Sequence, residues 1–315
     1  MKNKRMDSGL PPSLIKAFYT VKPMVPRDLQ LFARRQLARV QKHQQTSTWP
    51  IFPGSETLPP GWKGWKDNKQ FALILTHDVD TLKGWEHIKD LMNIDRVMGF
   101  RSSFNIVPER YPIEIERLWD IKNQGFELGV HGLNHDGKLI QSEIVFLKRA
   151  KKINEYICEW DACGFRAPSM HCDLELFKCL KIAYDASTFD TDPFEPKSHG
   201  VHTIFPFAVF NEANHICYWE LPYTLPQDST LFIILQERTI DIWKQKLDWI
   251  AQNGGMALLN THPDYMDFDG DHGENEDYPA KLYIDFLNYV TAKYCGQFWN
   301  PLPKDLVQFL NETYA

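Results

Sequence analysis

Short apolar runs recur along residues 71–262 and alternate with segments whose apolar positions fall three or four residues apart. The helical spacing covers residues 83–99, 112–125, 142–157, 174–182 and 239–255. The strand-like runs lie at residues 71–77, 102–108, 126–131, 163–168, 183–188, 217–222 and 254–262. Strands that alternate with helices are typical of βαβ units and a parallel sheet. Seven such units predict an α/β fold in which about seven parallel strands close into a barrel.

Residues 1–69 differ from residues 70–315, which hold the predicted barrel, because they are rich in Pro, Lys, Arg, Gln and Trp. We interpret them as an N-terminal extension. Residues 26–44 within it predict a basic amphipathic helix, whose apolar face would be formed by Leu29, Phe32, Leu37 and Val40. We expect this helix to pack on the barrel with its basic face in solvent. The alternative is peripheral contact of residues 23–43 with an anionic membrane surface.

Net charge, cysteine spacing and the length of the apolar runs argue against several classes of protein. The net charge of −6 over 315 residues argues against an unspecific nucleic-acid binder. The six cysteines form no CxxC pair, so we expect free thiols. The sequence contains neither an apolar stretch of secretory length near residue 1 nor a run of about 18 apolar residues that could span a bilayer. We therefore expect a cytoplasmic location.

Polar residues collect where the predicted strands end. The first strand is followed by Asp78 and Asp80, and the last by His262. The strands between them are followed by His131, His135, Arg166, Asp185, Asp190 and Asp192. The carboxyl ends of barrel strands meet at one mouth, where active sites are found. Each residue alone has an ordinary structural explanation, such as a helix cap for Asp78 and Asp80. Together these explanations require several coincidences at one edge of the sheet, so we favour a catalytic site.

The histidines in this set have the spacing of metal ligands. His131 and His135 lie four residues apart, which places both imidazoles on one side of a turn. A carboxylate from another strand would complete a set of two histidines and one aspartate. Three protein ligands leave one position open for water, which is the pattern of catalytic rather than structural zinc.

The order of these motifs over residues 71–265 resembles the polysaccharide deacetylase family, also called the NodB-homology domain and classed with carbohydrate esterases. The motifs are Asp-x-Asp at Asp78, His-x-x-x-His at His131, Arg-x-Pro at Arg166, and the strand-end His262. The resemblance implies a distorted (β/α) barrel, usually of seven strands. It also implies a hydrolase that removes acetyl groups from N- or O-acetylated sugars with a divalent metal ion, zinc in first place.

The resemblance also implies a role for each matching residue. Asp78 would be the general base, and Arg166 would hold its carboxylate. His262 would be the general acid, oriented by Asp190 in our assignment, with Asp185 and Asp192 as the alternatives. The metal ligands would be Asp80, His131 and His135. The sequence departs from the family pattern at Val79, which separates two aspartates that are usually adjacent, and at Ser169, where an aromatic residue is usual.

The implied partner is an acetylated sugar or glycan precursor, which we expect to be nucleotide- or lipid-linked. Two other functions stay open at this point. One is a metal-dependent amidohydrolase that acts on a non-sugar amide. The other is a glycan-binding relative without catalysis, against which the intact set of strand-end residues argues.

Overall fold

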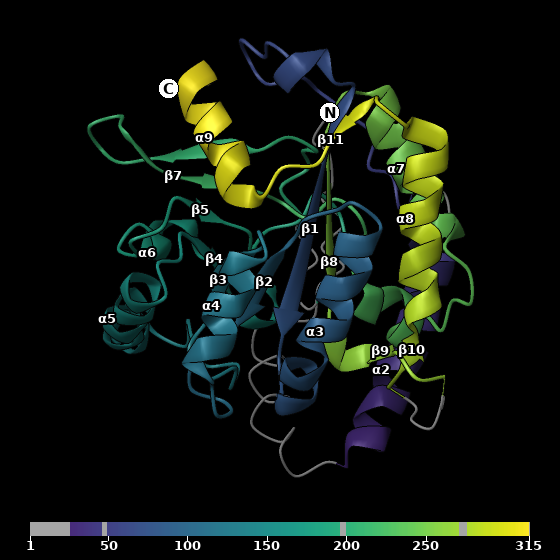
Figure 1. The fold of residues 1–315 in the computed structure, drawn as a ribbon, viewed down its shortest axis with the longest axis horizontal. Helices are drawn as coiled ribbons and strands as arrows, with labels where there is room; N and C mark the ends of the chain where they lie inside the picture. The colour runs from purple at the N-terminus through teal and green to yellow at the C-terminus, as the bar shows by residue number, and fades with distance from the viewer. Residues whose placement is uncertain (1–25, 46–48, 196–199, 271–275, 315) are drawn as a thin grey trace, which may run out of the picture.

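The computed structural model describes residues 26–45, 49–195, 200–270 and 276–314 (Figure 1). A strand occurs in each of the seven predicted stretches. These strands are β1 (Phe71–Val79), β2 (Ser103–Ile106), β3 (Glu127–His131), β4 (Gly164–Arg166), β5 (Tyr184–Asp185), β7 (Ile216–Glu220) and β8 (Met256–Thr261). They run parallel in the order β8-β1-β2-β3-β4-β5-β7. The prediction of seven parallel strands is confirmed.

The sheet is centred on β1, which pairs with β2 on one side and β8 on the other. All nine residues of β1 are buried, and the continuous apolar run FALIL at its start predicts this burial on both faces. The short β11 (Phe298–Trp299) pairs with the start of β1, and β6 (Phe207–Phe210) runs antiparallel to β7. Between β7 and β8, the backbone N–H groups of Thr224 and Leu225 donate to the Leu258 carbonyl. The sheet therefore curls into a distorted half-barrel, which agrees with the predicted fold class.

Helices cover the outer face of the curled sheet (Figure 1). The predicted ones are α3 (Leu82–Val97), α4 (Ile115–Asn123), α5 (Glu143–Glu159), α6 (Leu174–Phe177) and α7 (Asp241–Gln252). Three further elements were not predicted: α8 (Ala280–Tyr294), α9 (Pro303–Tyr314) and the π-helical segment η4 (Ser229–Ile234). The core lies between sheet and helices; in α3, for example, Trp85, Ile88 and Leu91 are almost fully buried.

The N-terminal helix α2 (Arg27–Gln45) forms where it was predicted, but it packs the other way round. Leu31 and Ala38 are its buried residues, at 4% and 2% exposed. The four residues of the predicted apolar face are 44–59% exposed: Leu29, Phe32, Leu37 and Val40. The expected packing is therefore wrong.

Charge pairing explains the reversed orientation of α2. Arg27 forms a bidentate ion pair with Glu276, and Lys42 pairs with Glu237. Between them, Arg35 donates to the backbone carbonyl of Ile233 at 2.9 Å. The basic side of the helix thus meets acidic and carbonyl oxygens of the barrel, and the apolar side is left facing outward.

Other parts of the extension also pack on the barrel. The indole of Trp65 is buried and donates to the Gly254 carbonyl at 2.8 Å. The division of the chain at residues 69 and 70 stays a prediction. All six cysteines are free, as expected. Within the part of the chain that the structure describes, no helix is long and apolar enough to cross a membrane.

Candidate active site

Asp78, near the end of β1, and Asp80, just beyond that end, lie on the inner side of the sheet, because side chains alternate along a strand. His77, which directly precedes Asp78, points to the opposite side, toward the helix layer. Its Nδ1 lies 2.7 Å from Thr261 Oγ1, and its Nε2 lies 3.1 Å from Asp95 Oδ2 on α3. His77 is therefore a buried histidine with both ring nitrogens partnered outside the site.

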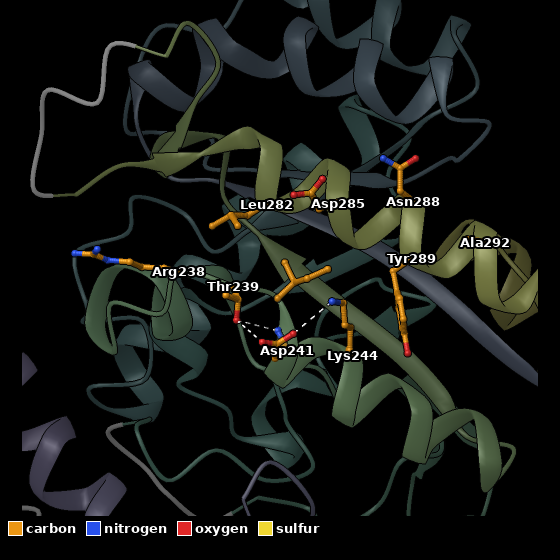
Figure 2. Close-up of a pocket in the computed structure, with 10 residues that line it drawn as sticks. Arg238, Thr239, Asp241, Lys244, Leu282, Asp285, Asn288, Tyr289 and Ala292 are labelled. Carbon is orange, nitrogen blue, oxygen red and sulfur yellow. Dashed lines mark hydrogen bonds and ion pairs between the residues drawn. The ribbon is translucent and has the colours of Figure 1, made fainter.

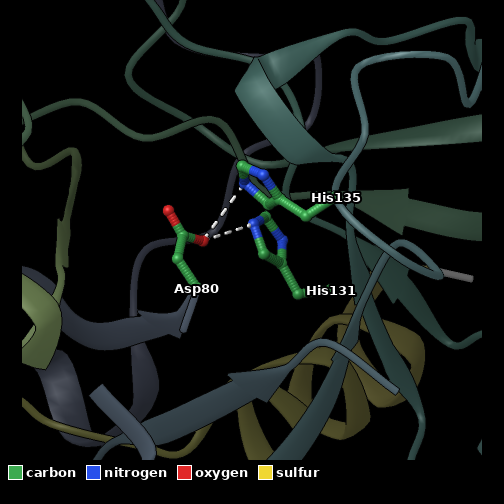
Figure 3. Close-up of side chains that lie close together, drawn as sticks. All are labelled: Asp80, His131 and His135. Atoms are coloured by element: carbon green, nitrogen blue, oxygen red, sulfur yellow. Dashed lines mark ion pairs between the residues drawn. The ribbon is translucent and has the colours of Figure 1, made fainter. Parts of the chain in front are cut away.

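Asp80, His131 and His135 come together as one cluster (Figure 3). Asp80 Oδ1 lies 3.3 Å from Nε2 of His131 and 3.2 Å from Nε2 of His135. His131 ends β3, and His135 sits in the following loop with a positive φ of 50°. The two histidines reach one carboxylate because the loop turns back at this point.

The cluster fits a divalent metal ion in three ways. Ligands about 2.0–2.2 Å from a tetrahedral zinc lie about 3.3–3.5 Å from each other, close to the observed spacing. His131 Nδ1 lies 3.0 Å from the Arg166 carbonyl, so Nδ1 carries the proton and Nε2 presents its lone pair to the cluster. Asp80 Oδ1 is buried and accepts no hydrogen bond from the described residues. Burial raises the pKa of Asp80, but His135 and His131 outweigh it and hold the pKa well below its usual value.

Asp78 lies beside this cluster with its carboxylate held on both oxygens. Oδ1 accepts from Asn105 Nδ2 at 2.7 Å and from Arg166 Nη1 at 3.0 Å, and Oδ2 accepts from Asn260 Nδ2 at 2.9 Å. Oδ2 is also 3.9 Å from His131 Nε2. Burial raises the pKa of Asp78, but the charges of Arg166, His131 and His262 and the Asn105 hydrogen bond lower it far below its usual range. Asp78 is therefore ionised at neutral pH.

Arg166 lies where the sequence placed it, at the end of β4 and fully buried. Besides Asp78, its Nη1 donates to Thr76 Oγ1 at 2.9 Å and Asn260 Oδ1 at 2.6 Å, and its Nε donates to the Ala186 carbonyl at 2.7 Å. Asn105 and Asn260 were not predicted. Both stand at strand ends, in the stretches FNIV and LLNTH, and that position was the available signal.

His262 faces Asp78 from β8, with Nε2 at 4.0 Å from Asp78 Oδ2. Its other side is held by Asp228, whose Oδ1 is 2.6 Å from Nδ1 and whose Oδ2 accepts from the His262 backbone N–H at 2.7 Å. Tyr278 donates a further hydrogen bond to Asp228 Oδ2 at 3.0 Å. Asp228 therefore orients His262.

The assignment of Asp190 to this role is corrected. Asp190 Oδ2 forms a buried ion pair with Lys246 Nζ at 2.5 Å. The two alternatives also lie elsewhere: Asp185 accepts from Ser187 Oγ, and Asp192 from Tyr223 Oη. Asp185 in β5 and Asp190 and Asp192 after it are fully buried with these partners, whereas Asp228 reaches His262 from the segment that follows β7.

The alternative that Asp78 and Asp80 merely cap α3 does not hold, because Asp264 is the residue that caps this helix. Its carboxylate accepts from the backbone N–H of Asp80 at 2.9 Å and of Thr81 at 2.8 Å, just before the helix. A Cβ on Gly84 would lie only 2.2 Å from Asp264 Oδ2, so only glycine fits there. Because Asp264 takes these N–H groups, the β1 carboxylates are left for the site.

Replacement of Asp264 by alanine is expected to lower the free energy of unfolding by about 1–2 kcal/mol, because two backbone donors at the start of α3 lose their acceptor. Urea denaturation measures the change. Asp90→Ala is the matched control, since Asp90 is an exposed acid on the same helix and pairs only with His87 among the described residues. A loss no larger in Asp264→Ala than in the control would contradict the capping role.

A pocket of about 590 Å³ opens over the cluster. Asp80, His135 and Asp264 line it, together with Ser169, the position where the motif departs from the resemblance. Arg27 and Gln30 bring α2 into the pocket wall. Asp78 and His262 are buried and do not line this pocket.

A second hollow, of about 520 Å³, lies between the start of α7 and α8 (Figure 2). Asp241, Lys244 and Tyr289 are among its lining residues, and Asp241 and Lys244 pair with each other at 3.3 Å. None of the strand-end residues lines it. The strand-end residues therefore gather at the barrel mouth and not at this second hollow.

Comparison with known proteins places the fold. No family model and no curated protein matches the sequence. Among solved structures, a protein described as a polysaccharide deacetylase from Mycobacterium smegmatis aligns over 79% of this chain and 92% of its own, with 18% identity and a TM-score of 0.60. A protein described as a polysaccharide deacetylase from Pseudomonas aeruginosa PAO1 aligns over 84% of this chain and 99% of its own. The sequence identity is 12% and the TM-score is 0.62. The PuuE allantoinase aligns over 84% of this chain and 98% of its own, with 14% sequence identity and a TM-score of 0.62. This chain therefore has the fold of the polysaccharide deacetylases.

Proposed function

We propose that this chain is a metal-dependent hydrolase that removes an acetyl group from an N-acetylated, or O-acetylated, sugar or glycan precursor. One observation supports the proposal most. An ionised, immobilised carboxylate, Asp78, stands 3.9 Å from a residue of the Asp80–His131–His135 cluster and 4.0 Å from the Asp228-bound His262. A base, a ligand set and an acid thus lie together at the barrel mouth, where Asp80 and His135 line the pocket.

The ligand set would be Asp80, His131 and His135, and zinc is the ion that we propose, because one carboxylate and two imidazoles with an open position are a catalytic zinc pattern. When bound, such an ion polarises a carbonyl group and lowers the pKa of water. The same set could hold another divalent ion, and elemental analysis distinguishes such an ion from zinc.

Asp78 and His262 would each carry out one of the two proton transfers that the reaction needs. Asp78 would take the proton of the attacking water, although its low pKa makes it a weak base. Arg166, Asn105 and Asn260 keep its carboxylate in place. His262, protonated and held by Asp228, gives a proton to the departing nitrogen or oxygen. The acetyl group leaves as acetate.

A second candidate is an amidohydrolase that acts on a small cyclic amide. The observation that favours it is the fold shared with the PuuE allantoinase. The same base, acid and ligand set would serve the hydrolysis of a ring amide. The two candidates differ in the substrate that the pocket accepts.

The test compares the two substrate classes on the purified full chain. Elemental analysis is expected to find about one divalent ion per chain. Acetate release from N-acetylated hexosamine oligosaccharides is expected, with loss on chelation and recovery when the ion is restored. Hydrolysis of allantoin without acetate release would replace the proposal by the amidohydrolase. A metal-loaded chain that binds acetylated oligosaccharides and hydrolyses neither substrate would identify a glycan-binding protein.

A further inference from the structure

The outward side of α2 is an apolar stripe formed by Leu29, Phe32, Leu37 and Val40. These side chains are 56%, 59%, 44% and 54% exposed, although their spacing is that of a buried helix face. Scattered single apolar residues are normal on a protein surface, whereas four on one side of one helix indicate a contact surface.

The helix is held in this orientation by its other side. Arg27 with Glu276, Lys42 with Glu237 and Arg35 with the Ile233 carbonyl attach α2 along its length. The stripe is therefore presented by a docked helix whose polar partners lie on the barrel. Arg34 and Arg39 are exposed as well, and Arg39 donates a hydrogen bond to Gln236 Oε1 at 3.4 Å, so cationic side chains remain at the surface of the same helix.

Charge along the chain points to the kind of partner. Residues 1–45 contain ten of the 35 lysines and arginines and only two of the 41 acidic residues. Their net charge is +8, while the whole chain carries −6, so the remaining residues carry −14. An apolar stripe within a strongly basic segment suits an anionic lipid surface, where apolar side chains enter the headgroup boundary and lysines and arginines meet lipid phosphates.

We propose that the apolar stripe of α2 docks on an anionic lipid surface. A second copy of the chain is the less suitable occupant, because a two-fold dimer through α2 would bring two basic segments of like charge together. The geometry differs from that of a helix which binds lipid through a free basic face, since here three basic residues hold the barrel and the apolar residues face outward.

The start of α2 adjoins the pocket, because Arg27 and Gln30 line the pocket wall, and Leu29 of the stripe lies between these two residues in the sequence. A chain docked through α2 would have its pocket beside the lipid headgroups. If the proposed function holds, and this step rests on it, the substrate class is an acetylated sugar carried on a lipid. Docking itself does not depend on turnover, so each proposal can fail without the other.

Co-sedimentation of the full chain with vesicles tests the docking. Vesicles of phosphatidylcholine with phosphatidylglycerol are expected to bind the chain, and binding is expected to weaken in high salt. The double variant Phe32→Glu with Leu37→Glu is expected to bind at least about tenfold more weakly. The matched control is Val97→Glu with Ile144→Glu, since Val97 and Ile144 are 74% and 81% exposed on α3 and α5. All four positions are exposed, so the variants should fold, as circular dichroism would verify.

Three results would overturn the proposal. The first is an intact chain that does not sediment with anionic vesicles. The second is equal vesicle binding by the stripe variant and the control, which would place the contact elsewhere. The third is a chain that is dimeric in solution and ignores vesicles but becomes monomeric in the stripe variant, which would make the stripe a self-association face. An intact chain that binds vesicles but releases no acetate would contradict the proposed function and leave the docking proposal standing.

Discussion

Asp78→Asn protein is expected to keep its metal ion and to lose turnover by about a factor of 10³. An amide cannot take the proton of the attacking water, and a general base contributes about 10²–10⁴ to the rate. Asp78 is not one of the three clustered ligands, so the ion should stay. Elemental analysis and acetate release, measured on the same preparation, test both halves of the expectation.

Asp80→Asn is the matched variant, because Asp80 lies two residues along the same strand end and belongs to the cluster. It is expected to lose both the ion and the activity. Thermal unfolding should accompany both measurements, since Arg166 loses a charged partner when Asp78 becomes neutral. Unchanged turnover in Asp78→Asn, or loss of its metal, would remove Asp78 from the role of base.

Asp228→Asn is expected to shift the alkaline limb of the turnover profile to lower pH and to reduce turnover by about 10²-fold at pH 8. Burial lowers the pKa of His262, but the charge and hydrogen bond of Asp228, with the charges of Asp80 and Asp78, outweigh it and raise the pKa to about 10. A general acid works only while protonated. Loss of the Asp228 charge lowers the pKa, so His262 becomes neutral, and activity declines, at a lower pH. A pH series of turnover measures the shift.

The control for the Asp228 variant replaces Asp190, the residue that the sequence analysis assigned to orient His262. Asp190→Asn combined with Lys246→Met removes the buried ion pair as a unit, which avoids an uncompensated buried lysine. The alkaline limb is expected to stay in place in this double variant. A limb that moves with Asp190 and not with Asp228 would restore the original assignment.

The sequence by itself determined the seven strands and the residues that meet at their ends. The strands were predictable because continuous apolar runs such as FALIL are stable only when buried on both faces. Asp78, Asp80, His131, Arg166 and His262 follow those strands directly, and parallel strands bring their carboxyl ends to one edge. Once the strands are known, the meeting of these residues follows from local position alone.

Only the tertiary structure decided which groups support that set. Asp228 lies eight residues beyond the end of β7, and nothing local distinguishes it from Asp190 or Asp192. Its contact with His262 depends on the path of the intervening chain. The orientation of α2 was likewise hidden, because helical periodicity locates the apolar and basic faces but not the surface that each one meets. The acidic residues Glu237 and Glu276, distant in sequence, attract the basic face and leave Phe32 and Leu37 outside.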